Sequence, residues 1–208
     1  MLKEFYIYRI INIVTFILSK KNFQRIFIFS LLWRSFFLVD WDSSKDERIS
    51  FGNHFFYCKL SDRIIASIGE ISLSIFLSNK FKIKYILIIN IFLAEIFAWL
   101  ALILNATYFC GNYEYKFWGL SFFIIALKNA KEKNVIYTLV YFLITIYYLK
   151  YKEICSEKTK INYSVSAIKN NIKKSIKTNN VDKDWKKWKS NKSWMNIIFG
   201  LSSILTFF

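Results

Sequence analysis

The chain has 208 residues, of which 55% are hydrophobic and 20% aromatic, with a formal net charge of +16 and no proline. This composition excludes collagen, proline-rich linkers and an intrinsically disordered chain. An ordinary soluble domain is also disfavoured, because the apolar residues come in long runs. The sequence therefore predicts an all-α integral membrane protein, a multi-pass bundle of about four to six transmembrane helices.

Codon usage explains the missing proline better than helix geometry does, although a chain of unkinked helices would also lack it. Lysine outnumbers arginine by 25 to 5, only 5 glycines occur, and Ile, Asn, Phe and Tyr are abundant. This pattern is typical of a strongly AT-rich genome. The number of Lys or Phe residues therefore carries little functional weight, whereas arginines and glutamates within apolar segments carry more.

Residues 1–62 are expected to form anchor or interfacial helices followed by a polar loop. Phe5–Ser19 lacks a small-residue cleavage site, which predicts a retained helix rather than a cleaved signal peptide. Phe23–Val39 is long enough to cross a bilayer, but Arg25 and Arg34 lie on opposite faces of its helix. A membrane span and an interfacial helix are both open interpretations of this segment.

Residues 63–149 are predicted to form a four-helix transmembrane core, since a hydrocarbon core of about 30 Å requires about 20 helical residues. The four helices are expected at Arg63–Asn79, Tyr85–Leu104, Glu114–Leu127 and Val135–Leu149. Residues 150–193 are expected to form a basic cytoplasmic amphipathic segment, and residues 194–208 a C-terminal membrane helix.

The distribution of lysine and arginine predicts which membrane face is cytoplasmic. The face with residues 40–63 and 150–192 carries 17 of them, and the opposite face, with residues 79–84 and 128–133, carries 6. The positive-inside rule makes the first face cytoplasmic. Both short loops on the second face are themselves basic, so an inverted or dual topology stays open.

Polar and small residues of the first core helix share one face. They are Arg63, Ala66, Ser67, Glu70 and Ser74, and four isoleucines occupy the opposite face. A charge inside the bilayer costs at least about 2.5–3.5 kcal/mol, so this stripe is expected to face protein or water. Its small residues also permit close helix packing.

Two further glutamates, Glu95 and Glu114, lie on the helices that follow. Glu95 borders a second stripe, made of Asn90, Ala94, Ala98, Ala101 and Asn105. We hypothesise a polar cluster that opens to the cytoplasmic face, binds an ion or substrate, and is lined by Arg63, Glu70, Glu95, Asn105 and Glu114. The alternative is a structural network in which Arg63 pairs with the glutamates and pins the helices together.

The basic segment is expected to lie on the membrane and to bind anionic lipid head groups. Its apolar residues at helical spacing predict a surface amphipathic helix within Tyr163–Lys177, through Val165, Ile168, Ile172 and Ile176. Tryptophan concentrates at the membrane interface, which predicts that position for Trp185, Trp188 and Trp194. Nucleic acid is not an expected partner, whereas a membrane protein or a second copy of the chain stays an alternative.

Few residues suit cofactor chemistry. The single histidine, His54, lies outside the predicted spans, and Cys58, Cys110 and Cys155 match no metal or redox spacing. A glycine-rich phosphate loop and a Gly-x-Ser-x-Gly motif are both missing. No metal and no cofactor are therefore expected, and no catalytic residue is assigned.

Several short motifs follow one another between residue 33 and the C-terminus. They are Trp33-Arg34-Ser35, Arg48, Arg63-x-x-Ala66-Ser67-x-x-Glu70, Glu95-x-x-x-Trp99, Asn105, Glu114-x-x-x-Trp118, Trp185-x-x-Trp188 and Trp194-Met195. In this order they resemble a family of uncharacterised polytopic membrane proteins of algae, other microbial eukaryotes and some bacteria. The sequence lacks the proline that usually follows the Arg-Ser pair in that family. The resemblance implies a multi-span helical fold and no known activity.

Three functions are consistent with these features. The leading expectation is a small transporter or channel-like bundle whose intramembrane carboxylates handle a cation or proton. The second is a membrane-embedded enzyme acting on lipid, with Glu70 or Glu95 as acid or base, because burial raises the pKa of a carboxyl group. The third is a structural subunit of a membrane complex, in which the carboxylates hold helices together.

Overall fold

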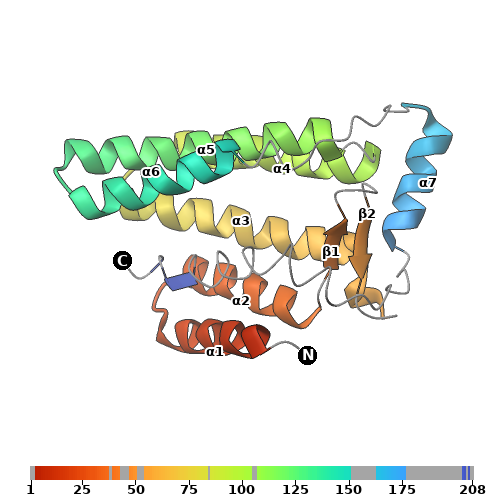
Figure 1. Cartoon of the computed structure of the whole chain (residues 1–208), viewed down its shortest axis with the longest axis horizontal. Coiled ribbons are helices and arrows are strands. Elements are labelled where there is room, and N and C mark those ends of the chain that lie inside the picture. Colours follow the sequence, from red (N-terminus) through yellow and green to blue (C-terminus); the bar gives the residue numbers. More distant parts are fainter. Residues whose placement is uncertain are drawn as a thin grey trace. The chain divides into compact units, whose positions relative to one another are not determined.

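A computed structural model of the chain describes residues 3–37, 39–42, 47–50, 54–83, 85–104, 107–150, 163–176, 203–204 and 206 (Figure 1). Its longer helices are α1 (Lys3–Leu18), α2 (Asn22–Phe36), α3 (Lys59–Phe81), α4 (Tyr85–Leu104), α5 (Thr107–Lys131), α6 (Val135–Lys150) and α7 (Val165–Ile176). Between α2 and α3 lie the paired strands β1 (Val39–Asp42) and β2 (Glu47–Ser50) and the 3-10 helix η1 (Phe55–Tyr57). The predicted helical fold is confirmed, and the small sheet falls in the segment expected to be a polar loop.

The chain divides into two compact units. The first unit comprises Met1–Asp40, Ile49–Phe76 and Thr178–Phe208. The second unit comprises Trp41–Arg48 and Leu77–Lys177. The first unit therefore holds α1, α2 and most of α3, and the second holds the end of α3 and the helices α4 to α7.

Helices α1 and α2 form an antiparallel hairpin in the first unit (Figure 1). Arg9 donates hydrogen bonds of 2.8 and 3.3 Å to the carbonyl oxygen of Ser35, and its guanidinium lies 4.5 Å from the ring centroid of Phe36. At the other end of the hairpin, Arg25 Nε donates to the carbonyl oxygen of Ser19 at 2.8 Å. Both arginines therefore bind carbonyls at helix ends, where intrahelical donors are missing.

Helix α2 is shorter than the predicted segment Phe23–Val39. It ends at Phe36 because the chain enters β1 at Val39, and its 15 residues rise about 22 Å. Helix α1, with 16 residues, rises about 24 Å. Both lengths fall short of a hydrocarbon core of about 30 Å, which favours the interfacial interpretation over the membrane span.

Helices α4, α5 and α6 lie side by side in the second unit (Figure 1). Helix α5 begins at Thr107, so the predicted start at Glu114 was wrong, and Glu114 lies about two turns inside the helix. The extra turns of α5 pack along α4, where the rings of Phe97 and Tyr113 stack with centroids 4.9 Å apart.

One described helix, α4, is long and apolar enough to cross a membrane by length and composition. The described chain also holds two shorter apolar helices, Arg9–Leu18 and Val135–Leu149. Helices α3 and α5 have 23 and 25 residues but carry more charged groups. The clearest predicted span, Tyr85–Leu104, therefore coincides with α4 in both its bounds and its composition.

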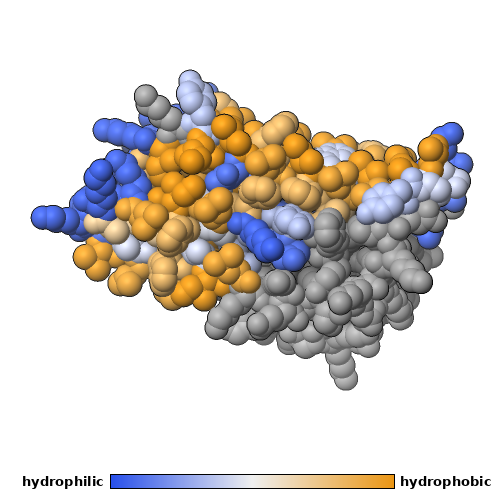
Figure 2. Space-filling model, turned by 90° about the horizontal axis from the view of Figure 1, so that it is seen from above, coloured by the Kyte–Doolittle hydropathy of each residue, from blue (hydrophilic) through white to orange (hydrophobic). Residues whose placement is uncertain are grey.

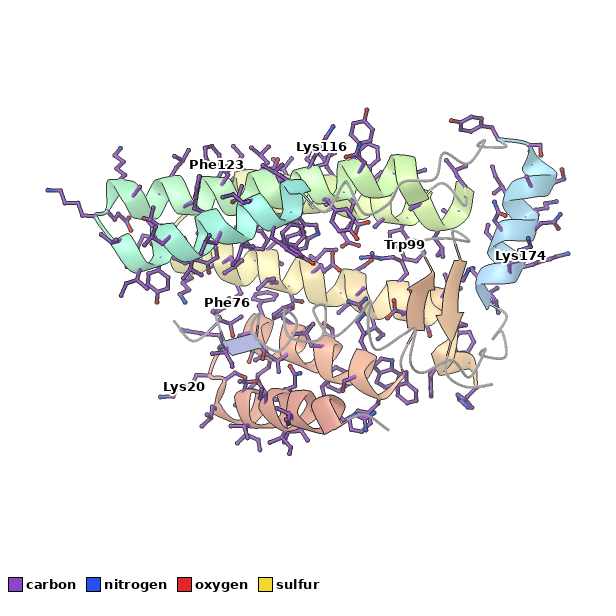
Figure 3. The ribbon with its side chains drawn as sticks, viewed as in Figure 1. Lys20, Phe76, Trp99, Lys116, Phe123 and Lys174 are labelled. Atoms are coloured by element: carbon purple, nitrogen blue, oxygen red, sulfur yellow. The ribbon has the colours of Figure 1, made fainter. Side chains whose placement is uncertain are left out.

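Large apolar side chains point outward on the described helices. On α4, Ile86, Ile89 and Phe92 are 53%, 54% and 58% exposed, whereas Ala94 and Ala98 are 0% and 3% exposed. Apolar side chains cover much of the face that Figure 2 shows. In Figure 3, the side chain of Phe123 likewise projects away from α5.

Small polar side chains share the interior with buried apolar ones. Many are serines, among them Ser30, Ser35, Ser67, Ser72, Ser74, Ser78 and Ser121. The described small residues of the stripes predicted on α3 and α4 are confirmed as buried, whereas Glu70 is half-buried. Of the four isoleucines opposite the α3 stripe, those at positions 64 and 68 are exposed and those at 71 and 75 are half-buried. The described helices thus bury small polar groups alongside an apolar core that includes Ile28, Leu31 and Leu87, and they leave many large apolar groups exposed.

Buried hydroxyl groups find their hydrogen-bond partners within their own helices. Ser30, Ser72 and Ser74 each donate to a carbonyl oxygen three or four residues earlier, at 2.7 Å. Thr145 donates to the carbonyl oxygen of Tyr141 at 2.8 Å. A hydroxyl bonded in this way needs no water, so its burial does not leave a polar group unsatisfied.

Helices α3 and α5 are each followed by a lysine in the left-handed region of the backbone. Lys82 after α3 has a φ of 52°, and Lys133 after α5 has a φ of 59°. The amide of the next residue, Ile83 or Asn134, donates to the carbonyl oxygen five residues earlier, at 3.0 and 2.9 Å. This is the Schellman motif, whose left-handed position favours glycine because a β-carbon is strained there.

Replacing either lysine by glycine should stabilise the protein. We expect Lys82→Gly and Lys133→Gly each to raise the free energy of unfolding by about 0.5–1 kcal/mol, because the strained β-carbon is removed. Unfolding of the purified chain in detergent micelles measures the change. Lys131→Gly, in the last turn of α5, is the matched control and should lower stability by about 1 kcal/mol. Destabilisation by both replacements at the left-handed positions would contradict this account of the helix ends.

Candidate functional site

Four charged side chains come together in the first unit and are called the charge cluster here. They are Arg34 at the end of α2 and Asp62, Arg63 and Glu70 on α3. The side chains of Asp62 and Arg63 are 4% and 3% exposed, and those of Glu70 and Arg34 are 18% and 21% exposed. Arg63 is therefore buried, as its place in the predicted polar stripe requires.

Contacts between α2 and η1 determine where α3 begins. The ring centroid of Trp33 lies 5.0 Å from that of Phe56, in an edge-to-face arrangement. Ser61 Oγ donates to the carbonyl oxygens of Phe56 and Cys58 at 2.8 and 2.9 Å, which caps the turn before the helix. Asp62, the next residue, is thereby placed close to the end of α2.

Arg34 and Asp62 form a two-pronged ion pair. Arg34 Nε donates to Oδ1 of Asp62 at 2.8 Å, and Nη2 donates to Oδ2 at 3.4 Å. Burial by itself lowers the pKa of Arg34, but the carboxylates of Asp62 and Glu70 together more than offset this effect, so the pKa is raised above its ordinary value. The guanidinium therefore stays charged, and the bidentate geometry holds α2 against the start of α3.

Arg63 and Glu70 pair along one face of α3. Arg63 Nη2 lies 3.3 Å from Oε1 of Glu70, and Arg63 Nε donates to Oγ of Ser67 at 3.4 Å. The spacing of four and seven residues places the three side chains on successive turns of one face. The structure thus brings together two residues of the predicted site, Arg63 and Glu70.

The two pairs belong to one electrostatic group. Glu70 raises the pKa of Arg34 and Arg63 lowers it, after the larger effects of burial and Asp62. Two guanidiniums and two carboxylates sum to zero net charge. Because both carboxylates have an arginine partner, the charge cluster is better suited to hold helices together than to capture an additional cation.

Asp62 is the member of the charge cluster that sequence reasoning missed. The predicted polar loop extends to residue 62, whereas α3 begins three residues earlier, at Lys59. An acidic residue in the first turn of a helix interacts favourably with the helix dipole. An acidic residue at a helix start, directly before Arg63, is the sequence feature from which Asp62 could have been recognised.

The other two predicted carboxylates, Glu95 and Glu114, lie in the second unit. Glu95 is 4% exposed on α4, and Glu114 is half-buried on α5. Asn90 is also buried on α4, and its amide nitrogen makes no hydrogen bond within the part of the chain that the structure describes. Helix α4 therefore carries a buried carboxyl and a buried amide inside an otherwise apolar segment.

Several predicted features fall outside the described residues. They are Asn105, Trp185, Trp188, Trp194, most of 150–193 and nearly all of 194–208. Within the described ranges, no group of three or more His, Cys, Asp or Glu side chains is placed to hold a metal ion.

Comparison with known proteins identifies no similar protein. The resemblance drawn from the order of the sequence motifs therefore stays a prediction. No protein-family model, curated protein or solved structure matches the chain.

Proposed function

We propose that the chain is a multi-pass membrane protein in which α3, α4, α5 and α6 cross the bilayer while α1 and α2 lie in its interface. The observation that carries the proposal is the large set of exposed apolar side chains on these helices, such as Ile86, Ile89 and Phe92 on α4, together with small polar groups among the buried residues. Monomeric soluble proteins rarely expose large contiguous apolar surfaces. Hydrocarbon is the solvent for which such a surface carries no penalty.

Helix lengths support this arrangement. Helices α3, α4 and α5 rise about 34, 30 and 37 Å, which matches a hydrocarbon core of about 30 Å. The charged residues in the middle of α3 belong to the ion-paired stripe and do not face outward. Helix α6 has 16 residues and rises only about 24 Å, as α1 does, so its assignment to the bilayer rests on its packing along α5 and on its exposed Leu139 and Leu143 rather than on its length.

Within this class, we favour a structural subunit of a membrane complex. The charge cluster supports this choice, because its arginines and carboxylates balance one another and connect α2 to α3. Removing one member of a buried ion pair is strongly destabilising, so such a cluster acts as a helix-pinning device. The outward apolar faces then remain for lipid and for neighbouring membrane subunits.

The size of the assembly in mild detergent tests this role. We expect the chain, extracted from its native membranes, to migrate on a native gel well above its own mass of 24.9 kDa plus the bound micelle. The same material should be resistant to extraction at alkaline pH, as integral proteins are. Migration at the mass of a single chain plus its micelle in every mild detergent would contradict a role as a subunit.

A second candidate function is cation or proton handling at Glu95. The observation that favours it is the burial of this carboxyl within α4, a helix that also buries the amide of Asn90 without a hydrogen-bond partner in the described chain. Ionisable residues inside spans commonly mark ion or proton pathways. This candidate does not involve the balanced charges of the first unit.

Replacing Glu95 by glutamine separates the two functions. If Glu95 carries protons or cations, we expect Glu95→Gln to abolish dye-detected flux in proteoliposomes, because the amide cannot ionise. The thermal midpoint should change little, since glutamine has nearly the same shape. Glu132→Gln, at the exposed end of α5, is the control and should leave flux unchanged. If the parent protein shows no flux above empty vesicles, the transport candidate is wrong and the structural role stands.

A further inference from the structure

Helix α7 carries an exposed apolar line bordered by lysines. Val165, Ile172 and Ile176 lie within about 20° of one direction around the helix, and they are 69%, 40% and 43% exposed. Lys169 and Lys173 are also exposed and lie about 40° and 80° to one side of that line. The amphipathic helix predicted in this region is confirmed, and its apolar line remains exposed.

A hydrogen bond fixes α7 to the end of α4. Asn171 Nδ2 donates to the carbonyl oxygen of Ile103 at 3.1 Å, and both helices belong to the second unit. Ile103 lies in the last turn of α4, where carbonyl oxygens have no intrahelical donor. Ser175, one turn after Asn171, is buried. Helix α7 is therefore anchored where α4 ends.

We propose that the exposed face of α7 docks on the bilayer surface and binds anionic lipid head groups. The inference rests on the proposed function, because it requires α4 to cross the membrane. A helix fixed to the end of a 20-residue span lies at the depth where the head groups begin. There, the apolar line enters the acyl boundary while the lysine ammonium groups reach the lipid phosphates.

The positive charge of the chain favours an anionic lipid leaflet as the surface to which the exposed face of α7 binds. The chain has a net charge of +16, and the end of α4 that carries α7 lies on the face that the positive-inside rule makes cytoplasmic. Anionic lipids concentrate in the cytoplasmic leaflet and attract basic segments close to the membrane. An acidic protein would meet the same lysines, but it would gain nothing from an apolar line placed at membrane depth.

Hydrogen exchange of the full chain in nanodiscs tests the proposal. Nanodiscs of phosphatidylcholine alone are compared with nanodiscs that also contain phosphatidylserine. A lysine near an anionic surface strengthens binding about fivefold, so two lysines should slow amide exchange across α7 by about 25-fold in the anionic nanodiscs. Exchange within α4 should be slow in both lipids.

Charge reversal on the two sides of α7 supplies a matched pair of variants. The double variant Lys169→Glu/Lys173→Glu should lose the slowing caused by phosphatidylserine. Lys174 lies about 180° from the apolar line and projects away from α7 in Figure 3, so Lys174→Glu should retain most of the slowing. Equal slowing in the double variant and the parent would overturn the proposal.

The rate of amide exchange in α4 separates a failure of α7 docking from a failure of the proposed membrane span. Slow exchange in α4, combined with α7 exchange that is equal in both lipids, overturns the docking of α7 alone and leaves its face to an acidic protein. Fast exchange in α4 overturns the proposed membrane span and the docking together. Slow α4 exchange with lipid-dependent α7 exchange supports both.

Discussion

Replacing Asp62 by alanine should lower the free energy of unfolding by about 3–5 kcal/mol, the usual cost of removing one partner from a buried ion pair. The carboxylate is 4% exposed and receives two hydrogen bonds from Arg34, at 2.8 and 3.4 Å. Without it, the guanidinium keeps its charge and loses its nearest counter-ion. Unfolding of the detergent-solubilised chain, followed by helical circular dichroism, measures the loss.

Two control variants make this result specific to the buried pair. Glu132→Gln breaks the exposed pair of Glu132 with Lys128, which are 51% and 34% exposed, and should change stability by less than about 0.5 kcal/mol. The double variant Arg34→Met/Asp62→Leu removes both charges and should recover most of the stability, since apolar replacements of buried pairs are often neutral. Equal losses for Asp62→Ala and Glu132→Gln would show that the charge cluster does not hold α2 to α3.

Replacing Gly69 by alanine should lower the free energy of unfolding by about 2–3 kcal/mol, through overpacking. A β-carbon at this position would overlap Oγ of Ser30 and lie 2.6 Å from Cβ of Ser30. Oγ can rotate away, but Cβ is fixed by the backbone of α2, so the helices must separate. Thermal unfolding of the purified variant measures the effect.

A second glycine, Gly119, supplies a control for Gly69→Ala, and a change at Ser30 should compensate for it. At Gly119 an added β-carbon would lie 3.2 Å from Cδ2 of Leu149, the end of a flexible side chain, so Gly119→Ala should change stability little or raise it by up to about 1 kcal/mol. Ser30→Gly in the Gly69→Ala background should restore part of the loss, because it removes the fixed Cβ. If Gly69→Ala is as stable as the parent, α2 and α3 do not approach each other at this point.

The helix faces could be predicted from the sequence because their periodicity is local. Residues three and four apart fall on one face, so the stripe that includes Ser67 and Ser74, and its exposed opposite face, followed from spacing alone. The small residues Ala94 and Ala98 on α4 were recognised in the same way. The pairing of Arg63 with Glu70 also lies within one helix, and the alternative structural network anticipated it.

Features that depend on long-range contacts could not be predicted in this way. The pairing of Arg34 with Asp62 joins residues 28 positions apart on different helices, and no local pattern encodes it. The extra turns at the start of α5 include Tyr113, whose ring stacks on Phe97 of α4, a contact between helices that local spacing does not encode. Glycine usually marks helix ends, but a chain with few glycines uses lysine instead, which conceals the ends from sequence reasoning.

The central claim is that the outer faces of the helices contact lipid. Spin labels placed one at a time along α4, in the protein reconstituted into vesicles, measure it most directly through collision with oxygen and with a water-soluble nickel complex. Labels at Ile89 and Phe92 should collide with oxygen and not with nickel, while labels at Ala94 and Ala98 should collide little with either. Nickel collision at Ile89 as frequent as that of a label in water would contradict the account.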